Sequence, residues 1–132
     1  MVHDSREVSE LARQRVLIVD DSPQVRQELR TLLPLAGDIE IVGEAADGQE
    51  AIQMAGALCP QVILMDLEMP VLDGYEATRQ IKALSPSCRV VALTVHGDES
   101  ARQKAMQAGA DLFLAKGVSV KALVGAVSER RE

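Results

Sequence analysis

Residues 61–70 read QVILMDLEMP, and this stretch delivers one carboxylate, Asp66, to the end of a short apolar run. Residues 62–65 are all large and apolar, and Pro60 and Pro70 bound the stretch. Such a run is typical of a strand that is buried on both faces. Ligands bind beyond the carboxyl ends of strands in open α/β sheets, so the position of Asp66 predicts a site of chemistry.

The rest of the chain repeats this unit of strand and helix. Further strands are predicted at residues 16–19, 39–45, 90–93 and 112–115. Apolar residues at helical spacing follow each strand, with predicted helix starts at Ser22, Asp47, Asp73, Asp98 and Val120. This alternation indicates an α/β fold with a doubly wound parallel sheet. Since 39–45 alternates like an edge strand, the strand order 2-1-3-4-5 is favoured, which is the flavodoxin-like (βα)5 arrangement.

Length and composition restrict the class of protein. The 132 residues fit one domain, with residues 1–14 as a polar lead-in and 15–130 as the domain itself. No apolar run approaches the roughly 20 residues of a membrane span, and the N-terminus lacks a secretory layout, so we expect a cytoplasmic protein without a membrane partner. The formal charge of -6 argues against direct nucleic-acid binding by this segment.

Three carboxylates are predicted to converge. If strands 16–19 and 62–65 are neighbours, they lie about 4.8 Å apart, and Asp20, Asp21 and Asp66 then share one small volume. One such aspartate would ordinarily be a helix cap or a solvated loop residue. Three together repel one another, and a hard cation such as Mg²⁺ relieves that repulsion. A backbone carbonyl from the loop after Asp66 would be a further ligand.

Two more strands of the predicted sheet end in polar residues that suit the same site. Thr94 ends the strand at 90–93, and Lys116 ends the strand at 112–115. Alone, Lys116 would be interpreted as a solvated surface residue and Thr94 as an ordinary strand or turn residue. With the acidic cluster they supply a hydroxyl and a cation, which are the groups needed to hold a transferring phosphoryl group. Asp66 is then the candidate nucleophile, because carboxylates form acyl phosphates.

The chain resembles a receiver domain of the bacterial two-component response regulators over residues 15–130. The resemblance is carried by VLIVDD at 16–21, VILMDLEMPVLDG at 62–74, ALT at 92–94 and GADLFLAKG at 109–117. It implies a phosphoacceptor signalling domain that takes a phosphoryl group from a sensor histidine kinase or a phosphotransfer protein. Such a domain is not an enzyme in the usual sense, since it catalyses only its own phosphorylation and dephosphorylation.

The resemblance also implies a role for each site residue. Asp66 would become the 4-aspartylphosphate, with Thr94 and Lys116 binding the phosphoryl oxygens. The implied Mg²⁺ ligands are Asp21, Asp66 and the backbone carbonyl of Glu68, with Asp20 supporting the metal through water.

The same resemblance places a switch and an output surface in the second half of the chain. Phe113 lies where the family has its switch aromatic, although a single aromatic in a strand is by itself a core residue. The implied output surface comprises the helix near 98–108, the strand 112–115 and the helix from Val120. Its partner would be a downstream output domain or protein. The glycine at position 117, directly after Lys116, is similar to the family branch whose members carry a helix-turn-helix output domain. A stand-alone regulator and a phosphorylation-dependent homodimer both stay open.

Two alternatives use much the same residues. A phosphatase of the haloacid dehalogenase type also forms an aspartyl phosphate, but it needs an aspartate two residues after the nucleophile, where this chain has Glu68. The chain also lacks room for the usual cap domain. The second alternative is a receiver-like binding module that no longer uses phosphorylation, and the intact acidic set argues against it.

Overall fold

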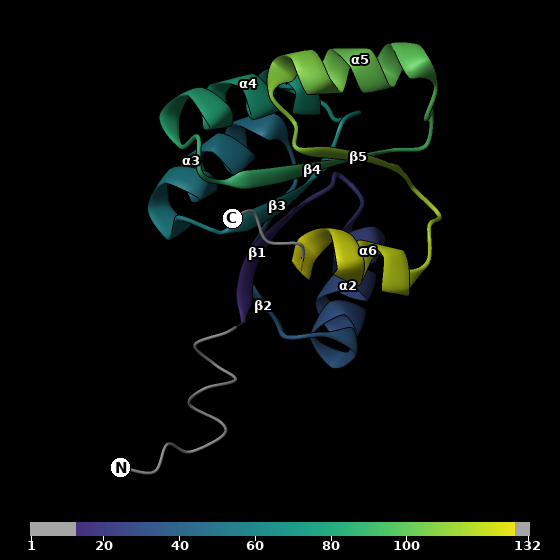
Figure 1. Cartoon of the computed structure of the whole chain (residues 1–132). Coiled ribbons are helices and arrows are strands. Elements are labelled where there is room, and N and C mark those ends of the chain that lie inside the picture. The colour runs from purple at the N-terminus through teal and green to yellow at the C-terminus, as the bar shows by residue number, and fades with distance from the viewer. Residues whose placement is uncertain (1–12, 129–132) are drawn as a thin grey trace.

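A five-stranded parallel sheet forms the centre of the molecule in a computed structural model, which describes residues 13–128 (Figure 1). The strands are β1 (Gln14–Val19), β2 (Ile39–Ala45), β3 (Val62–Asp66), β4 (Arg89–Thr94) and β5 (Leu112–Ala115). Their order across the sheet is β2-β1-β3-β4-β5, so the predicted flavodoxin-like topology is confirmed. The polar lead-in predicted for 1–14 lies almost wholly outside the described residues.

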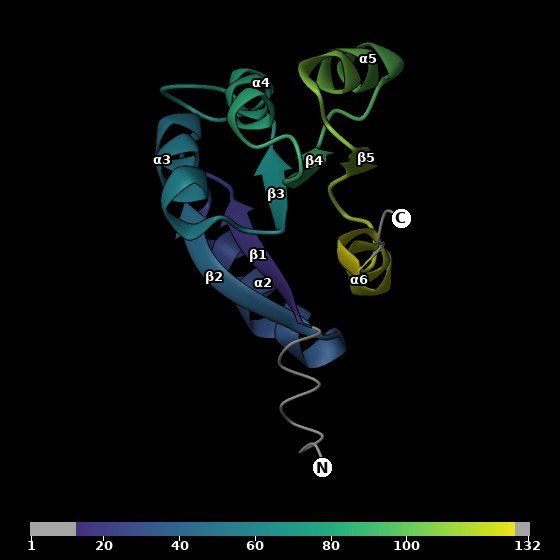
Figure 2. The same cartoon turned by 60° about the vertical axis from the view of Figure 1, so that its left-hand side comes forward.

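Helices cover both faces of the sheet, as Figures 1 and 2 show from two directions. They are α2 (Pro23–Ala36), α3 (Gly48–Leu58), α4 (Gly74–Leu84), α5 (Glu99–Ala108) and α6 (Val120–Ser128). Helices α2 and α6 pack together on one face, and α3, α4 and α5 form a row on the other. No helix within residues 13–128 is long and apolar enough to cross a membrane.

The two faces of the sheet explain why each central strand contains a continuous apolar run. Val16 and Ile18 of β1 belong to the core beneath α2 and α6, whereas Leu17 and Val19 belong to the core beneath α3 and α4. All five residues of β3 are buried, including the terminal Asp66. The strand expected from the opening motif is therefore a central strand with a charged residue at its carboxyl end.

Two strands begin earlier than their apolar runs. Strand β1 starts at Gln14, and β4 starts at Arg89, and both side chains are buried. Backbone hydrogen bonds extend the ladder there, since Gln14 N donates to Asp38 O and Arg89 N donates to Gln61 O. Hydrogen bonds of this kind leave no mark in the hydrophobic pattern.

Side-chain caps begin all five helices; Ser119 caps α6 through the Ala122 N–H, and the other four caps lie at the predicted positions. Each capping oxygen accepts a hydrogen bond from the backbone N–H three residues later, and these other four caps are Ser22, Asp47, Asp73 and Asp98. The helices therefore start close after the strands that precede them. This arrangement places the strand-end polar residues and the loops β1–α2, β3–α4 and β4–α5 at one edge of the sheet.

Helix α5 is attached mainly through small side chains. Its buried residues are Ala105 and Ala108, whereas α6 buries Leu123, Ala126 and Val127. Because alanine buries little apolar area, α5 has a weaker hydrophobic attachment to the sheet than α6.

Candidate functional site

Parallel pairing of β1 with β3 brings the three predicted carboxylates together. Val19 lies opposite Met65, so the residues that follow each of them emerge side by side at the carboxyl edge. One carboxylate oxygen from each of Asp20, Asp21 and Asp66 lies within 4.8 Å of the others. Asp20 and Asp66 are each only 2% exposed, whereas Asp21 is exposed to solvent. The site is thus a buried pair of carboxylates with a third at its mouth.

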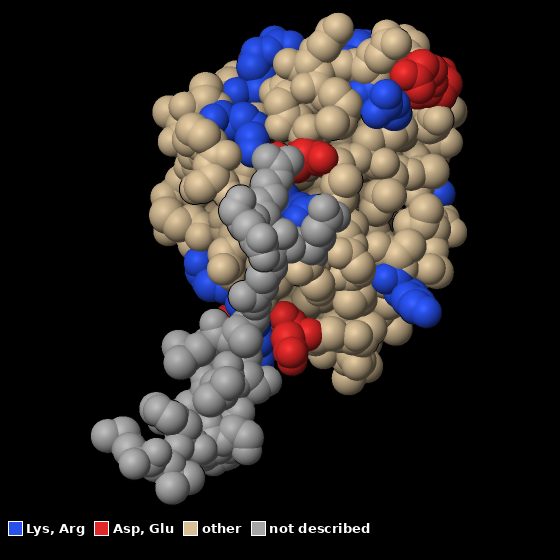
Figure 3. Space-filling view, in the orientation of Figure 1, with Lys and Arg blue, Asp and Glu red and all other residues tan. Residues whose placement is uncertain are grey.

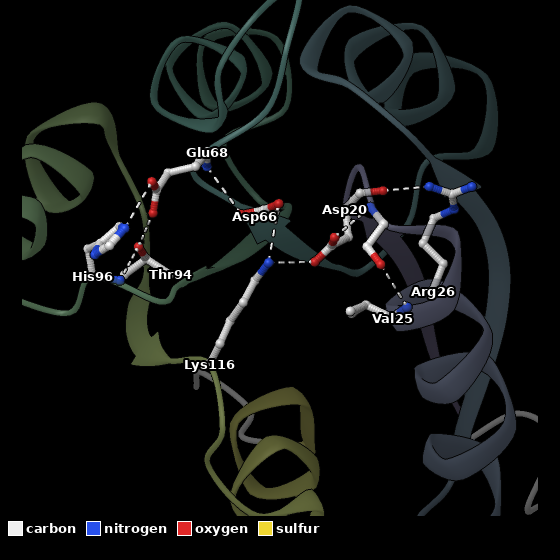
Figure 4. A network of polar contacts seen from close by, with 9 residues as sticks. Asp20, Val25, Arg26, Asp66, Glu68, Thr94, His96 and Lys116 are labelled. Carbon is white, nitrogen blue, oxygen red and sulfur yellow. Dashed lines mark hydrogen bonds and ion pairs between the residues drawn. The ribbon is translucent and has the colours of Figure 1, made fainter.

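Asp20 is held in place from several directions (Figure 4). Its Oδ1 accepts a hydrogen bond of 2.9 Å from the backbone N–H of Ser22, and its Oδ2 lies 2.8 Å from Lys116 Nζ. Arg26 Nη1 donates to the backbone oxygen of Asp20 at 2.7 Å and its Nε lies 3.4 Å from Glu44 Oε1. These contacts set the orientation of Asp20 relative to β1 and α2.

Asp66 has one oxygen that accepts a hydrogen bond and one whose contact is an ion pair. Its Oδ1 accepts a hydrogen bond of 3.1 Å from the backbone N–H of Glu68. Its Oδ2 is buried, accepts no hydrogen bond from the described residues, and lies 3.3 Å from Lys116 Nζ. Burial raises the pKa of Asp66, and the Asp20 carboxylate adds to this, against the lowering effects of the Glu68 N–H and Lys116. Asp66 therefore presents a poorly solvated oxygen to the centre of the site.

Lys116 is shared between the two buried carboxylates. Burial by itself would lower its pKa, but the hydrogen bond to Asp20 and the charge of Asp66 together raise that pKa above its ordinary value. The ammonium group therefore stays charged and neutralises part of the acidic cluster.

Thr94 lies at the same edge, at the end of β4, and is 1% exposed. Its hydroxyl donates to Glu68 Oε1 at 2.9 Å and accepts a hydrogen bond of 3.0 Å from the backbone N–H of His96. The sequence-based interpretation considered Glu68 only for its backbone carbonyl. The structure adds a role for its side chain, which engages the predicted phosphoryl-binding hydroxyl.

Phe113 lies in β5 opposite Ala92 and is partly buried. It packs against a small apolar cluster that also contacts the ring of Tyr75 and is formed by Leu67, Ala92, Ala105 and Ala110. Since Ala105 belongs to α5 and Leu67 follows Asp66, Phe113 is positioned between the site and the weakly attached helix.

The donor set at this edge fits a hard divalent cation. Three carboxylates converge there beside the Lys116 ammonium group, and the buried Oδ2 of Asp66 accepts no hydrogen bond from the described residues. Oxygen ligands of this type suit Mg²⁺, which also keeps several waters, and exposed Asp21 leaves the mouth of the site open to them.

The sheet order and the polar residues at its carboxyl edge together describe a receiver-type α/β domain. The sequence matches the family described as "Response regulator receiver domain" over residues 16–128, and the chain belongs to this family.

Similar proteins include the response regulator protein VraR of Staphylococcus aureus, which is 43% identical over 113 residues. That match covers 86% of this chain and 54% of VraR, so the chain spans about half the length of this relative. A solved LuxR-family two-component response regulator from Aurantimonas sp. SI85-9A1 is 34% identical, with a TM-score of 0.82 and coverage of 87% of this chain and 82% of that one. The signal receiver domain of NarL from Mycobacterium tuberculosis is 33% identical, with a TM-score of 0.83 and coverage of 87% and 93%.

Proposed function

We propose that Asp66 accepts a phosphoryl group from a sensor histidine kinase or a phosphotransfer protein. The observation that carries this proposal is the buried Oδ2 of Asp66, which accepts no hydrogen bond from residues 13–128 and lies 3.3 Å from Lys116 Nζ. This oxygen attacks the phosphorus of a phosphohistidine, the P–N bond breaks, and the electron pair leaves with the imidazole, which takes up a proton. The product is an acyl phosphate on Asp66.

The surrounding residues have complementary tasks in this proposal. Asp21, Asp66 and the Glu68 carbonyl would hold Mg²⁺ directly, with Asp20 acting through water, and the bound ion supplies positive charge against the transferring phosphoryl group. Lys116 keeps its ammonium group within reach of the phosphoryl oxygens. Thr94 donates its hydroxyl hydrogen bond to a phosphoryl oxygen once it releases Glu68 Oε1, its acceptor in the unphosphorylated protein.

The signal would leave the domain through α5, β5 and α6. Phe113 connects the site to α5 through the cluster that contains Ala105, and the only residues that α5 buries are two alanines, Ala105 and Ala108. A change in the position of Thr94 that alters the packing of Phe113 would therefore alter this surface. A phosphorylation-dependent homodimer or a downstream output domain or protein would respond to the altered surface.

The unit that carries out this function is proposed to span residues 15–130 and to act in the cytoplasm. Direct nucleic-acid binding by this segment is not expected, because its formal charge is -6 and the face in Figure 3 shows basic side chains in separate small groups. Any DNA contact would come from an output domain or protein.

The deciding experiment is to incubate the protein with acetyl phosphate and Mg²⁺ and to measure its mass. We expect a single phosphoryl adduct in the wild type and none in Asp66→Asn. Asp47→Asn is the matched control, since asparagine also caps a helix and this residue caps α3 away from the site. An adduct on Asp66→Asn would contradict the proposal, and multiple-turnover hydrolysis of a metabolite phosphate would favour the phosphatase alternative.

A further inference from the structure

We propose that the Glu68 carboxylate is a latch that opposes phosphorylation by holding the Thr94 hydroxyl in the unphosphorylated state. Its effect on signalling rests on the proposed function of Asp66, but the latch itself is a property of the unphosphorylated protein. Glu68 is in this sense a positioning residue that acts through Thr94.

The contact that forms the latch is a hydrogen bond of 2.9 Å from Thr94 Oγ1 to Glu68 Oε1. A threonine hydroxyl has one proton, so Thr94 cannot donate to Glu68 and to a phosphoryl oxygen at the same time. The backbone N–H of His96 donates to the same hydroxyl oxygen and further restricts its orientation. Phosphoryl binding by Thr94 therefore requires this hydrogen bond to break.

Glu68 is connected to the nucleophile as well as to Thr94. Its backbone N–H donates to Asp66 Oδ1 at 3.1 Å, while its side chain accepts from Thr94 (Figure 4). A phosphoryl group on Asp66 carries roughly 1.5 to 2 negative charges in place of the single charge of the carboxylate, so it adds up to about one negative charge close to the Glu68 carboxylate. The phosphoryl charge repels the Glu68 carboxylate, and the Thr94 hydroxyl turns its hydrogen bond from Glu68 to the phosphoryl group. Both effects release the Glu68 side chain.

The structure provides space for the released side chain. A cavity of about 290 Å³ lies beside Thr94, and its lining includes Glu68, Tyr75, His96 and Lys104. Glu68 Oε2 already lies 3.6 Å from His96 Nε2, and the Glu68 side chain is 50% exposed. Lys104 Nζ lies 4.7 Å from the centre of the Tyr75 ring, so the lining of the cavity also contains a cation. The carboxylate can therefore move away from Asp66 without being buried.

The first test measures the latch without metal or phosphodonor. Urea unfolding is compared for the wild type, Glu68→Ala, Thr94→Val and the double variant. We expect the two single changes to be non-additive, because either one removes the same hydrogen bond. Thr94→Ser keeps the hydroxyl, so Glu68→Ala should cost the same free energy of unfolding in the Thr94→Ser background as in the wild type. Additive effects in the valine cycle would overturn the latch.

The second test measures what the latch does to the active state. Beryllofluoride, a phosphoryl mimic, is titrated calorimetrically in the presence of Mg²⁺. We expect Glu68→Ala to bind it about fivefold more tightly than the wild type, and Glu68→Gln, which keeps an acceptor without the charge, to fall between them. Unchanged or weaker binding by Glu68→Ala would overturn the proposal.

The matched control removes the same charge from the opposite side of the site. Glu28 lines a separate cavity together with Asp20 and Lys116, so Glu28→Ala changes the local charge without touching Thr94. We expect it to leave the affinity within about twofold of the wild type. Equal tightening by Glu28→Ala and Glu68→Ala would show a general charge effect and no latch. If the wild type binds no beryllofluoride, the proposed function fails, while the unfolding cycle still decides the latch.

Discussion

Gly74 lies so close to the backbone of Asp66 that a Cβ atom on it would be 2.2 Å from the Asp66 carbonyl oxygen. The same Cβ would be 2.7 Å from the Cα of Leu67, so both obstacles are backbone atoms that no side-chain rotation can move. Gly74 N also donates to Leu67 O at 3.1 Å. The absence of a side chain at Gly74 therefore allows helix α4 to begin directly against the strand end that carries the nucleophile.

Gly74→Ala should displace either α4 or the strand end. We expect a loss of about 2 to 3 kcal/mol in the free energy of unfolding, together with less phosphoryl adduct on Asp66. Urea unfolding and the acetyl phosphate mass measurement test the two parts. Gly56→Ala is the control, because a Cβ at Gly56 of α3 meets nothing within 4 Å and should stabilise the protein by about 0.5 to 1 kcal/mol. Wild-type stability of Gly74→Ala would contradict the close approach.

Asp66→Asn should make the protein more stable at neutral pH. Because burial raises the pKa of Asp66 above its ordinary value of 3.8, the folded protein prefers the neutral carboxyl group. Stability from such a group is fully present below the unfolded pKa and is lost as pH rises through the folded pKa. Asparagine stays neutral, so we expect a gain in the free energy of unfolding at pH 7 that disappears as the pH falls toward the ordinary carboxyl pKa of 3.8.

Urea midpoints measured from pH 4 to pH 7 without divalent cations check this pH dependence. Asp47→Asn, which keeps a helix cap, serves as the control and should show no comparable gain. A wild type that is more stable than Asp66→Asn at pH 7 would mean that Lys116 compensates the Asp66 charge fully.

Lys116→Met should be destabilising, and Mg²⁺ should reverse much of the loss. The substitution leaves Asp20 and Asp66 as two buried carboxylates without their shared cation, which costs about 2 to 4 kcal/mol at pH 7. A cation bound to the acidic cluster replaces that charge. Thermal unfolding with and without Mg²⁺ should show a larger stabilisation of Lys116→Met than of the wild type. Lys121→Met, at an exposed position of α6, should behave like the wild type, and an equal response of all three would argue against a metal at the cluster.

The sheet order and the acidic cluster could be predicted because both follow from backbone periodicity. Strand β2 is buried only at its two end residues, whereas β3 and β4 are buried throughout and β1 at all positions but one, which is the difference expected of an edge strand. Once β1 and β3 are neighbours, the register that sets Val19 opposite Met65 brings Asp20 and Asp66 together. Their convergence needs no knowledge of side-chain packing.

The side-chain contacts around the cluster could not be predicted in the same way. The hydrogen bond between Thr94 and Glu68 depends on the rotamer of a half-exposed side chain in the β3–α4 loop, which the hydrophobic pattern does not specify. The need for glycine at position 74 depends on how closely α4 approaches Asp66. Asp73 already signals the start of this helix, so the following glycine gives no separate warning in the sequence.

The loop after Asp66 contains a backbone conformation that its sequence does not favour. Val71 has a φ of 70°, and Leu72 N donates to Pro70 O at 2.8 Å, which closes a three-residue turn centred on Val71. Turns of this kind with positive φ are rare and strained, and a β-branched residue increases the steric cost. The Val71 side chain is 82% exposed, so its burial does not offset that cost.

Val71→Gly should therefore stabilise the protein by about 0.5 to 1 kcal/mol, since glycine adopts positive φ without a steric penalty but loses more entropy on folding. Val71→Ala keeps a Cβ and should recover less of this free energy, which makes it the matched control. Urea unfolding of the three proteins gives the comparison, and hydrogen exchange of the Leu72 N–H reports whether the turn persists. Equal stability of the glycine and alanine variants would place the strain in the branched side chain alone, whereas a destabilised glycine variant would mean that Val71 restricts the unfolded chain more than it strains the folded loop.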